Sequence, residues 1–350
     1  MSRRAAASLV AGPSRIRLAA PCRLPRPAAC SSTRHLSSTG GGGGSSSRDP
    51  ASEAHFSKLS STWWSPSGEL GLLHAMNPVR VRWVLDKLRA VDAWDAAVRD
   101  VREGRKGREE PEEQGLRGRE TLDVGCGGGL LTESLARLGA RAHGIDATAS
   151  NIPIALHHAS QDPSLPLVGA SGPATDGASL SYEHTTAEDL LLRRRAECGA
   201  GNEGYDVVCA MEVIEHVAGP GDFLRSLAQL VRPGGHLFLS TIARTPLSYF
   251  LTILVAEDVL GLVSKGTHTH SQYINPTELD AFFTHEIPWL GQKPRDELDA
   301  RTPHKMRSET RGVAYIPWRG AWELSPDWAK EWKTEQGNYF YYIRRPLEDA

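Results

Sequence analysis

Cysteine is scarce in this chain of 350 residues, and long apolar runs are missing. The five cysteines are scattered and form no Cys-x-x-Cys pair, which excludes a disulfide framework and a simple zinc site. No apolar stretch reaches the roughly 18 residues that a membrane-spanning helix needs. The net charge of −2 argues against nucleic acid as a partner. The 40% apolar and 23% charged residues are typical of a globular, enzyme-sized protein in a reducing compartment.

The first 47 residues lack acidic side chains but contain seven arginines, and Ser and Ala fill much of the remainder. A basic, Ser-rich and acid-free segment of this kind is typical of a mitochondrial presequence. The stretch 34–38 resembles a matrix-protease cleavage context, and a run of glycines follows it. A disordered basic tail is the alternative. We predict a transit peptide and a Gly/Ser linker over residues 1–45, and a folded domain over 46–350.

Short apolar strands alternate with segments of helical periodicity in the folded part. This alternation predicts βαβ units and a Rossmann-like, doubly wound, mostly parallel sheet, with ligands at the carboxyl ends of the strands. Two segments read as insertions: 91–120 is a charged, solvated helix or loop, and 160–179 is a loop rich in Pro, Gly, Ala and Ser. The predicted strands are 120–124, 141–145, 181–184, 205–210 and 236–240, and the predicted helices are 130–138, 151–158 and 223–230.

The glycine-rich loop 125–129 follows the first strand. Glycines allow a tight turn and a close approach of the backbone to a ligand. A dinucleotide fingerprint would continue with glycine at position 130, which is Leu130 here. Asp123, inside the strand, would repel a pyrophosphate but suits the amino and sulfonium groups of S-adenosylmethionine. Asp146 ends the second strand, where a carboxylate can accept hydrogen bonds from both ribose hydroxyls. The pattern therefore predicts a nucleoside cofactor, with S-adenosylmethionine ahead of NAD.

Three polar residues, Glu212, Glu215 and His216, follow the fourth strand. On a helical turn these positions share one face. Two carboxylates and an imidazole can hold a divalent cation, with open positions left for a substrate. From the spacing alone, a polar helix start is an equally good interpretation. Without a metal, His216 becomes the candidate general base.

An apolar segment, 246–263, follows the fifth strand. Glu257 and Asp258 interrupt it, so it cannot span a bilayer. Two interpretations stay open. One is an amphipathic lid that rests on a membrane surface, and the other is an ordinary cap over the active site.

Several motifs also resemble a known family. LDVGCGGG, YDVVCAMEVIEHV and LVRPGGHLFLSTIAR resemble class I methyltransferases. More narrowly, the WW…GE…LH…NP…R block at 56–84, the KGTHTHSQYINPTEL segment and the closing GNYFYYIRR resemble the mitochondrial form of the ubiquinone biosynthesis O-methyltransferase family. The resemblance covers residues 56–350 and is interrupted at about 91–120, 160–179 and 291–312.

The resemblance implies site residues and an activity. It implies a magnesium-type site at Glu212, Glu215 and His216. It implies methylation of a phenolic hydroxyl on two polyprenylated substrates, a dihydroxybenzoate and demethylubiquinol, by an enzyme attached peripherally to the matrix side of the inner membrane with other ubiquinone-synthesis proteins. A non-catalytic scaffold of such an assembly is the alternative, but it would not need these site residues. The implied contacts to S-adenosylmethionine are Arg80, Gly125, Asp146 and Met211.

Overall fold

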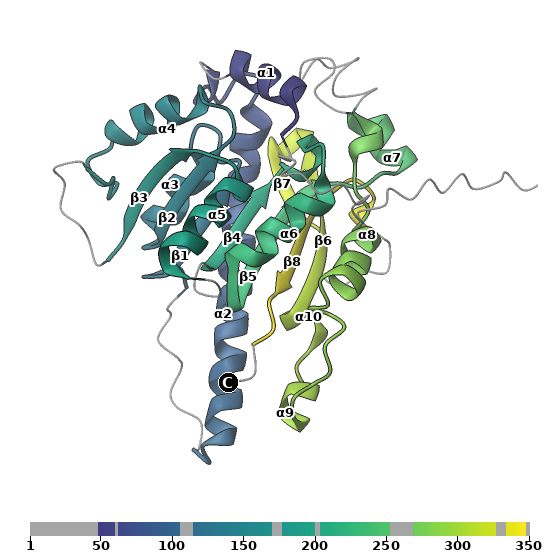
Figure 1. Cartoon of the computed structure of the whole chain (residues 1–350). Helices are drawn as coiled ribbons and strands as arrows, with labels where there is room; N and C mark the ends of the chain where they lie inside the picture. Colours follow the sequence, from purple (N-terminus) through teal and green to yellow (C-terminus); the bar gives the residue numbers. More distant parts are fainter. Residues whose placement is uncertain are drawn as a thin grey trace, which may run out of the picture. The chain divides into compact units, whose positions relative to one another are not determined.

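The computed structural model describes residues 48–59, 62–105, 115–169, 177–199, 204–252, 269–326 and 334–347, which all belong to one compact unit. In these residues, strands form a single mixed sheet in the order β3-β2-β1-β4-β5-β8-β6-β7 (Figure 1). The strands are β1 (Glu120–Val124), β2 (Arg141–Asp146), β3 (Ser179–His184), β4 (Tyr205–Met211), β5 (Val231–Ile242), β6 (Ser308–Ile316), β7 (Ala321–Leu324) and β8 (Asn338–Arg344).

The strands from β1 to β5 pair in parallel, which confirms the predicted doubly wound, mostly parallel sheet. The chain passes from β1 outward to β2 and β3 and then returns to place β4 on the other side of β1. Ligands bind at such a reversal of strand order, outside the carboxyl ends of the strands. The antiparallel strands β6, β7 and β8 were not predicted, although β8 pairs with β5 from Ile242↔Asn338 to His236↔Arg344.

Helices cover both faces of the sheet, so its central strand is buried on both sides. All seven residues of β4 are buried. Val207 and Cys209 pack into one hydrophobic cluster with α2 and α3, while Val208 and Ala210 pack into another with α5 and α6. The helices concerned are α2 (Gly71–Arg102), α3 (Leu130–Arg137), α4 (Asn151–Ser160), α5 (Ala187–Cys198) and α6 (Pro220–Leu230).

The predicted insertions are only partly as expected. Residues 91–102 continue the long helix α2, and Val91 is fully buried, so this part is not simply solvated. Segments 106–114 and 170–176, within the predicted insertions 91–120 and 160–179, lie outside the described residues. The 291–312 region contains α9 (Glu297–Ala300), α10 (His304–Arg307) and the first residues of β6.

The apolar segment after β5 begins with α7 (Pro246–Tyr249), and residues 253–268 lie outside the described part of the chain. Within the described part, no helix is both long and apolar enough to cross a membrane. The remaining helical segments are α1 (Pro50–Leu59), η2 (Ile214–His216), η4 (His270–Gln272), α8 (Pro276–Ala281), η5 (Phe282–Glu286), η6 (Pro317–Arg319) and η8 (Thr334–Gln336).

Candidate active site

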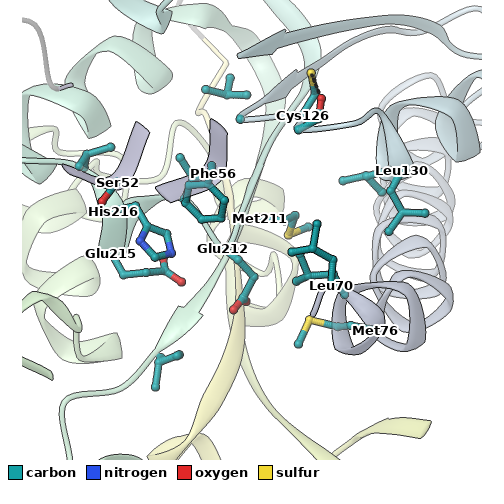
Figure 2. A pocket seen from close by; sticks show the side chains of 18 of the residues that line it. Ser52, Phe56, Leu70, Met76, Cys126, Leu130, Met211, Glu212, Glu215 and His216 are labelled. Atoms are coloured by element: carbon teal, nitrogen blue, oxygen red, sulfur yellow. Dashed lines mark hydrogen bonds between the residues drawn. The ribbon is translucent and has the colours of Figure 1, made fainter. Parts of the chain in front are cut away.

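A pocket of about 510 Å³ lies at the carboxyl ends of the parallel strands, between the strand ends and α1. This volume is typical of a small-molecule site. Figure 2 shows part of its lining, with Met211 and Leu130 toward one side and Glu215 and His216 toward the other. The pocket brings together every residue that the sequence predicted for the cofactor and the metal: Arg80, Gly125, Asp146, Met211, Glu212, Glu215 and His216.

The glycine loop needs glycine for two reasons. Gly125 and Gly127 have φ angles of 71° and 55°, in the left-handed region that side chains disfavour. A Cβ atom on Gly127 would lie 2.2 Å from the indole of Trp63, and one on Gly125 would lie 2.6 Å from Val213. The backbone therefore turns tightly and also allows Trp63 to lie directly against it.

Asp146 is held at the end of β2 by three donors. Its Oδ2 accepts a hydrogen bond from the backbone N of Gly127 at 2.8 Å. Its Oδ1 accepts from the backbone N of Thr148 at 2.7 Å and from Nδ2 of Asn151 at 3.2 Å. Burial raises the pKa of this carboxyl, and the hydrogen bonds act in the opposite direction. The carboxylate is thus fixed in one orientation at the position predicted to meet a ribose.

Asp123 lies inside β1 and also lines the pocket. Its Oδ2 accepts a hydrogen bond from Oγ1 of Thr132 at 2.6 Å. Burial raises the pKa of this carboxyl to about 6, so it ionises near neutral pH. A buried carboxylate favours a cationic partner, because the low dielectric makes an unpaired negative charge costly.

Arg80 is not the surface charge that its sequence context alone would favour, because only 5% of its surface is exposed. Asn77, one helical turn earlier, ties α2 to the start of α3 by donating to the carbonyl of Leu130 at 3.2 Å and to Oγ of Ser134 at 3.0 Å. Among the described residues, Nε and Nη2 of Arg80 have no hydrogen-bond partner. Burial lowers the pKa of its guanidinium. Arg80 lines the pocket, and its unpaired donors suit a carboxylate ligand.

The acidic wall of the pocket has an unusual backbone. Glu212 has a φ of 59°, the positive value that is rare outside glycine, directly after β4. Among the described residues, its buried Oε1 has no hydrogen-bond partner. Glu215 accepts a hydrogen bond from Oγ1 of Thr241 at 2.9 Å. Burial, and then the charge of Glu212, raise the pKa of Glu215 to about 8.

The predicted helical turn does not include all three of Glu212, Glu215 and His216. Glu215 and His216 lie in the 3₁₀ turn η2, and Glu212 precedes that turn. All three side chains line the pocket, with Glu215 next to His216 and Glu212 between that pair and Met211 (Figure 2). In the part of the chain that the structure describes, however, no group of three His, Cys, Asp or Glu side chains is arranged to hold a metal ion.

Helix α1 and the residues after it contribute side chains that sequence reasoning did not single out. The ring of Phe56 contacts the imidazole of His216 edge-on, with centroids 5.1 Å apart (Figure 2). Trp64 donates a hydrogen bond through Nε1 to the carbonyl of Gly128 at 3.0 Å. The sequence signal for these contacts was the pair of adjacent tryptophans at 63–64, because two neighbouring aromatic side chains beside turn residues are expected to pack against another part of the protein.

The sequence of this chain is similar to the sequences of known proteins. A family model described as "Methyltransferase domain" matches residues 101–285. A relative from Caulobacter vibrioides, named ubiquinone biosynthesis O-methyltransferase, is 39% identical over 279 residues, which cover 80% of this chain and 90% of the relative. The chain belongs to the ubiquinone biosynthesis O-methyltransferase family. A relative from Dictyostelium discoideum whose name adds "mitochondrial" is 39% identical over 229 residues, covering 65% of this chain and 64% of that protein.

Membership of this family confirms the predicted class I methyltransferase fold and the predicted enzyme class. It also confirms S-adenosylmethionine as the cofactor class that the glycine loop and Asp146 indicated. The individual contacts of Arg80, Gly125, Asp146 and Met211, and the metal ligands, stay predictions.

Proposed function

We propose that this protein transfers a methyl group from S-adenosylmethionine to a phenolic hydroxyl of polyprenyl-dihydroxybenzoate and of demethylubiquinol. The observation that carries the proposal is the 39% identity to a ubiquinone biosynthesis O-methyltransferase over 90% of that relative. The pocket is consistent with this proposal, because it brings the residues predicted to bind the cofactor together with the acidic residues Glu212 and Glu215. Nothing in the pocket favours the alternative of a non-catalytic scaffold.

The cofactor is oriented by charges at both of its ends. The buried guanidinium of Arg80 pairs with the methionine carboxylate, and Asp146 accepts hydrogen bonds from the ribose hydroxyls. Asp123, which lines the same pocket, balances the positive charge of the amino and sulfonium groups. Gly125 leaves room for the cofactor, and Met211, 6% exposed at the end of β4, packs against it. Holding the sulfonium carbon in line with the acceptor oxygen supplies much of the rate.

The acceptor phenol must lose its proton as it attacks the methyl group. Glu215 has a pKa of about 8, so its ionised form is a stronger base than an ordinary carboxylate. The hydrogen bond from Thr241 holds one carboxylate oxygen in place. His216, beside it and against Phe56, is the second candidate for the proton acceptor. Either residue can take the proton within the pocket.

We also propose that Mg²⁺ binds at Glu212, Glu215 and His216. Hard carboxylate oxygens and one imidazole on the same wall support this, as does the buried and unpaired Oε1 of Glu212. Because the three side chains are not arranged as a complete ligand set, the acceptor's own oxygens would have to contribute. A bound cation would lower the pKa of a catechol hydroxyl and orient it.

The location is proposed to be mitochondrial, at the matrix side of the inner membrane, together with other ubiquinone-synthesis proteins. The acid-free N-terminal segment and the name of the Dictyostelium relative support the mitochondrial part. Leu247, Phe250 and Leu251 are 46%, 53% and 45% exposed beside the pocket, which supports contact with lipid. Phe250→Glu should reduce flotation with liposomes that contain cardiolipin, while the exposed control Leu192→Glu should not. Equal flotation would contradict the membrane proposal.

The decisive experiment measures methyl transfer from labelled S-adenosylmethionine to a short-chain prenyl dihydroxybenzoate. It compares reactions with Mg²⁺, with a chelator, and with the Glu215→Ala variant. The exposed Glu297→Ala variant is the control. Loss of activity in both the chelated reaction and Glu215→Ala supports metal-assisted methylation. Activity that is unchanged by the chelator would mean that His216 or Glu215 accepts the phenolic proton without a metal. No activity under any condition would revive the scaffold alternative.

A further inference from the structure

Helix α1 forms part of the pocket wall but no part of the hydrophobic core. Figure 1 shows it beyond the carboxyl ends of the parallel strands. One face of the helix lines the pocket, through Ser52, Glu53, Phe56 and Leu59. None of the residues of α1 is buried. Since the burial of apolar surface is the main force that holds a helix in place, α1 belongs to the least stable part of the described fold.

The two tryptophans after α1 are, by contrast, firmly attached to the protein. Trp63 is buried against the glycine loop, and Nε2 of His74 lies 2.7 Å from its carbonyl oxygen. Trp64 donates from Nε1 to the carbonyl of Gly128 and stacks on the imidazole of His158, with the two ring planes 3° apart. The weakly packed helix α1 is therefore followed by a fixed anchor, which would keep it near the pocket if it moved.

Two neighbouring residues of α1 contact the two halves of the site. The ring of Phe56 lies edge-on against the imidazole of His216, on the side proposed for the acceptor (Figure 2). Oγ of Ser57 accepts a hydrogen bond from Oγ of Ser150 at 3.1 Å. Ser150 lies in the turn between Asp146 and α4, on the side proposed for the cofactor. A single helix thus connects the acceptor side of the pocket to the cofactor side.

A permanent pocket wall would be expected to pack more tightly than α1 does. Helix α3, which also lines the pocket, buries Leu131 and Leu135 in the core. The largest apolar side chain of α1, Phe56, stays only half-buried and contacts a residue of the pocket itself. Helices that open and close over an active site are drawn from such weakly packed elements, because closure must be reversible.

We infer that α1 is a lid that closes over cofactor and acceptor together and must open before the used cofactor can leave. The inference rests on the proposed function, which places the cofactor at Asp146 and the acceptor beside His216. With α1 closed, water is kept from the reacting groups. With α1 open, S-adenosylhomocysteine can exchange with fresh cofactor, so the opening of α1 limits the rate of this exchange.

A reversible cross-link in the full-length protein tests the inference. The hydroxyl oxygens of Ser57 and Ser150 are close enough for the double variant Ser57→Cys, Ser150→Cys to form a disulfide that holds α1 closed. Labelled S-adenosylhomocysteine is bound first, the protein is oxidised, and release of the label into excess unlabelled ligand is followed. Release from the oxidised variant should be at least about 10-fold slower than from the reduced variant, and a reductant should restore it. The wild type, treated with the same oxidant, controls for the native cysteines.

The variant Phe56→Ala tests the opposite change. It should release S-adenosylhomocysteine about 2- to 10-fold faster than the wild type, because it loses an aromatic contact that holds α1 over the pocket. Val101→Ala, at an exposed apolar side chain near the end of α2, is the matched control and should release the ligand at the wild-type rate.

Hydrogen exchange of the wild type gives an independent measurement that needs no substitution. The backbone amides of α1 should exchange at least about 10-fold faster in the free protein than in the complex with S-adenosylhomocysteine. The amides of α3 in the core should change less, because this helix does not need to move. If the two cysteines do not cross-link, this comparison decides alone.

Three outcomes would overturn the inference: equal release from the oxidised and the reduced double variant, unchanged release from Phe56→Ala, or equal exchange of the α1 amides with and without ligand. Each would mean that α1 is a permanent wall and that the cofactor exchanges by another route. Failure of the inference is distinguishable from failure of the proposed function. A wild type that binds S-adenosylhomocysteine but shows any of these outcomes disproves only the lid, whereas a wild type that does not bind this ligand contradicts the proposed function itself.

Discussion

Trp63 donates a hydrogen bond through Nε1 to Oδ1 of Asn151 at 3.1 Å, across 88 positions of the chain. Asn151 in turn donates to Asp146, the residue proposed to hold the ribose. The segment between α1 and α2 is therefore connected to Asp146 through the amide side chain of Asn151, in addition to the hydrogen bond from Trp64 to the glycine loop. This connection couples the order of the N-terminal segment to the orientation of the Asp146 carboxylate.

Trp63→Phe should raise the KM for S-adenosylmethionine by about 2- to 10-fold, because it removes one buried hydrogen bond but keeps an aromatic ring. The kcat should change less, since Trp63 contacts Asn151 and the glycine loop, on the side proposed to hold the cofactor. Steady-state kinetics with varied cofactor measure both constants. Trp318→Phe, at a side chain that is 83% exposed, is the matched control. An unchanged KM in Trp63→Phe would show that the hydrogen bond from the indole is not required to position Asn151.

Gly127→Ala should destabilise the protein by about 1–3 kcal/mol more than Gly320→Ala. The two glycines have similar φ angles, 55° and 59°, so the backbone strain of the substitutions is comparable. A Cβ at Gly127 meets the Trp63 ring at 2.2 Å, whereas one at Gly320 meets nothing within 4 Å among the described residues. Urea unfolding of both variants isolates the cost of displacing Trp63. Equal losses of stability would mean that the indole moves aside without cost.

Arg80→Met should raise the KM for S-adenosylmethionine by at least about 10-fold, because a charge-assisted partner of the methionine carboxylate is lost. The positive charge of Arg80 also lowers the pKa values of Asp123 and Glu215. Its removal should therefore move the acidic limb of the kcat/KM profile to higher pH. Arg82→Met, on an exposed position of the same helix, should leave both the KM and the profile unchanged. An unchanged pH profile would show that the charge of Arg80 does not affect the pKa values of these carboxylates.

His236 should make the protein less stable as the pH falls from about 7 to about 5. Burial, and then the charges of Arg344, Arg119 and Arg232, lower the pKa of this imidazole well below its usual value. In the unfolded chain the imidazole binds a proton below about pH 6.5, whereas in the folded chain it stays neutral. The unfolded state then holds more protons, so stability decreases as the pH falls through that value.

His236→Gln keeps a polar partner for the hydroxyl of Tyr342, which lies 3.0 Å from Nδ1 of His236. This variant should lose less stability than the wild type on acidification, by up to about 1.4 kcal/mol per pH unit. Urea unfolding at several pH values measures the difference. His285→Gln, at an exposed position, should follow the wild type. An equal decrease of the unfolding free energy with falling pH in the wild type and His236→Gln would contradict the prediction.

The sequence alone was sufficient where a local pattern determines the local structure. The first predicted strand, 120–124, matches β1 in both bounds, and the predicted helix 130–138 differs from α3 by one residue. The glycines of the loop and Asp146 were identified because tight turns and strand ends have their own residue requirements. Chemistry that depends on such positions, here the cofactor class, could therefore be inferred before the fold was known.

Only the tertiary structure decided which distant side chains share the pocket. Helix periodicity cannot show that Arg80 is buried against carboxylates from β1 and η2, or that α1 places Phe56 on His216. It also could not reveal the positive φ of Glu212, which removes this residue from the expected helical face. Burial and pairing depend on contacts between residues far apart in the chain, and these arise only when the sheet and its helices assemble.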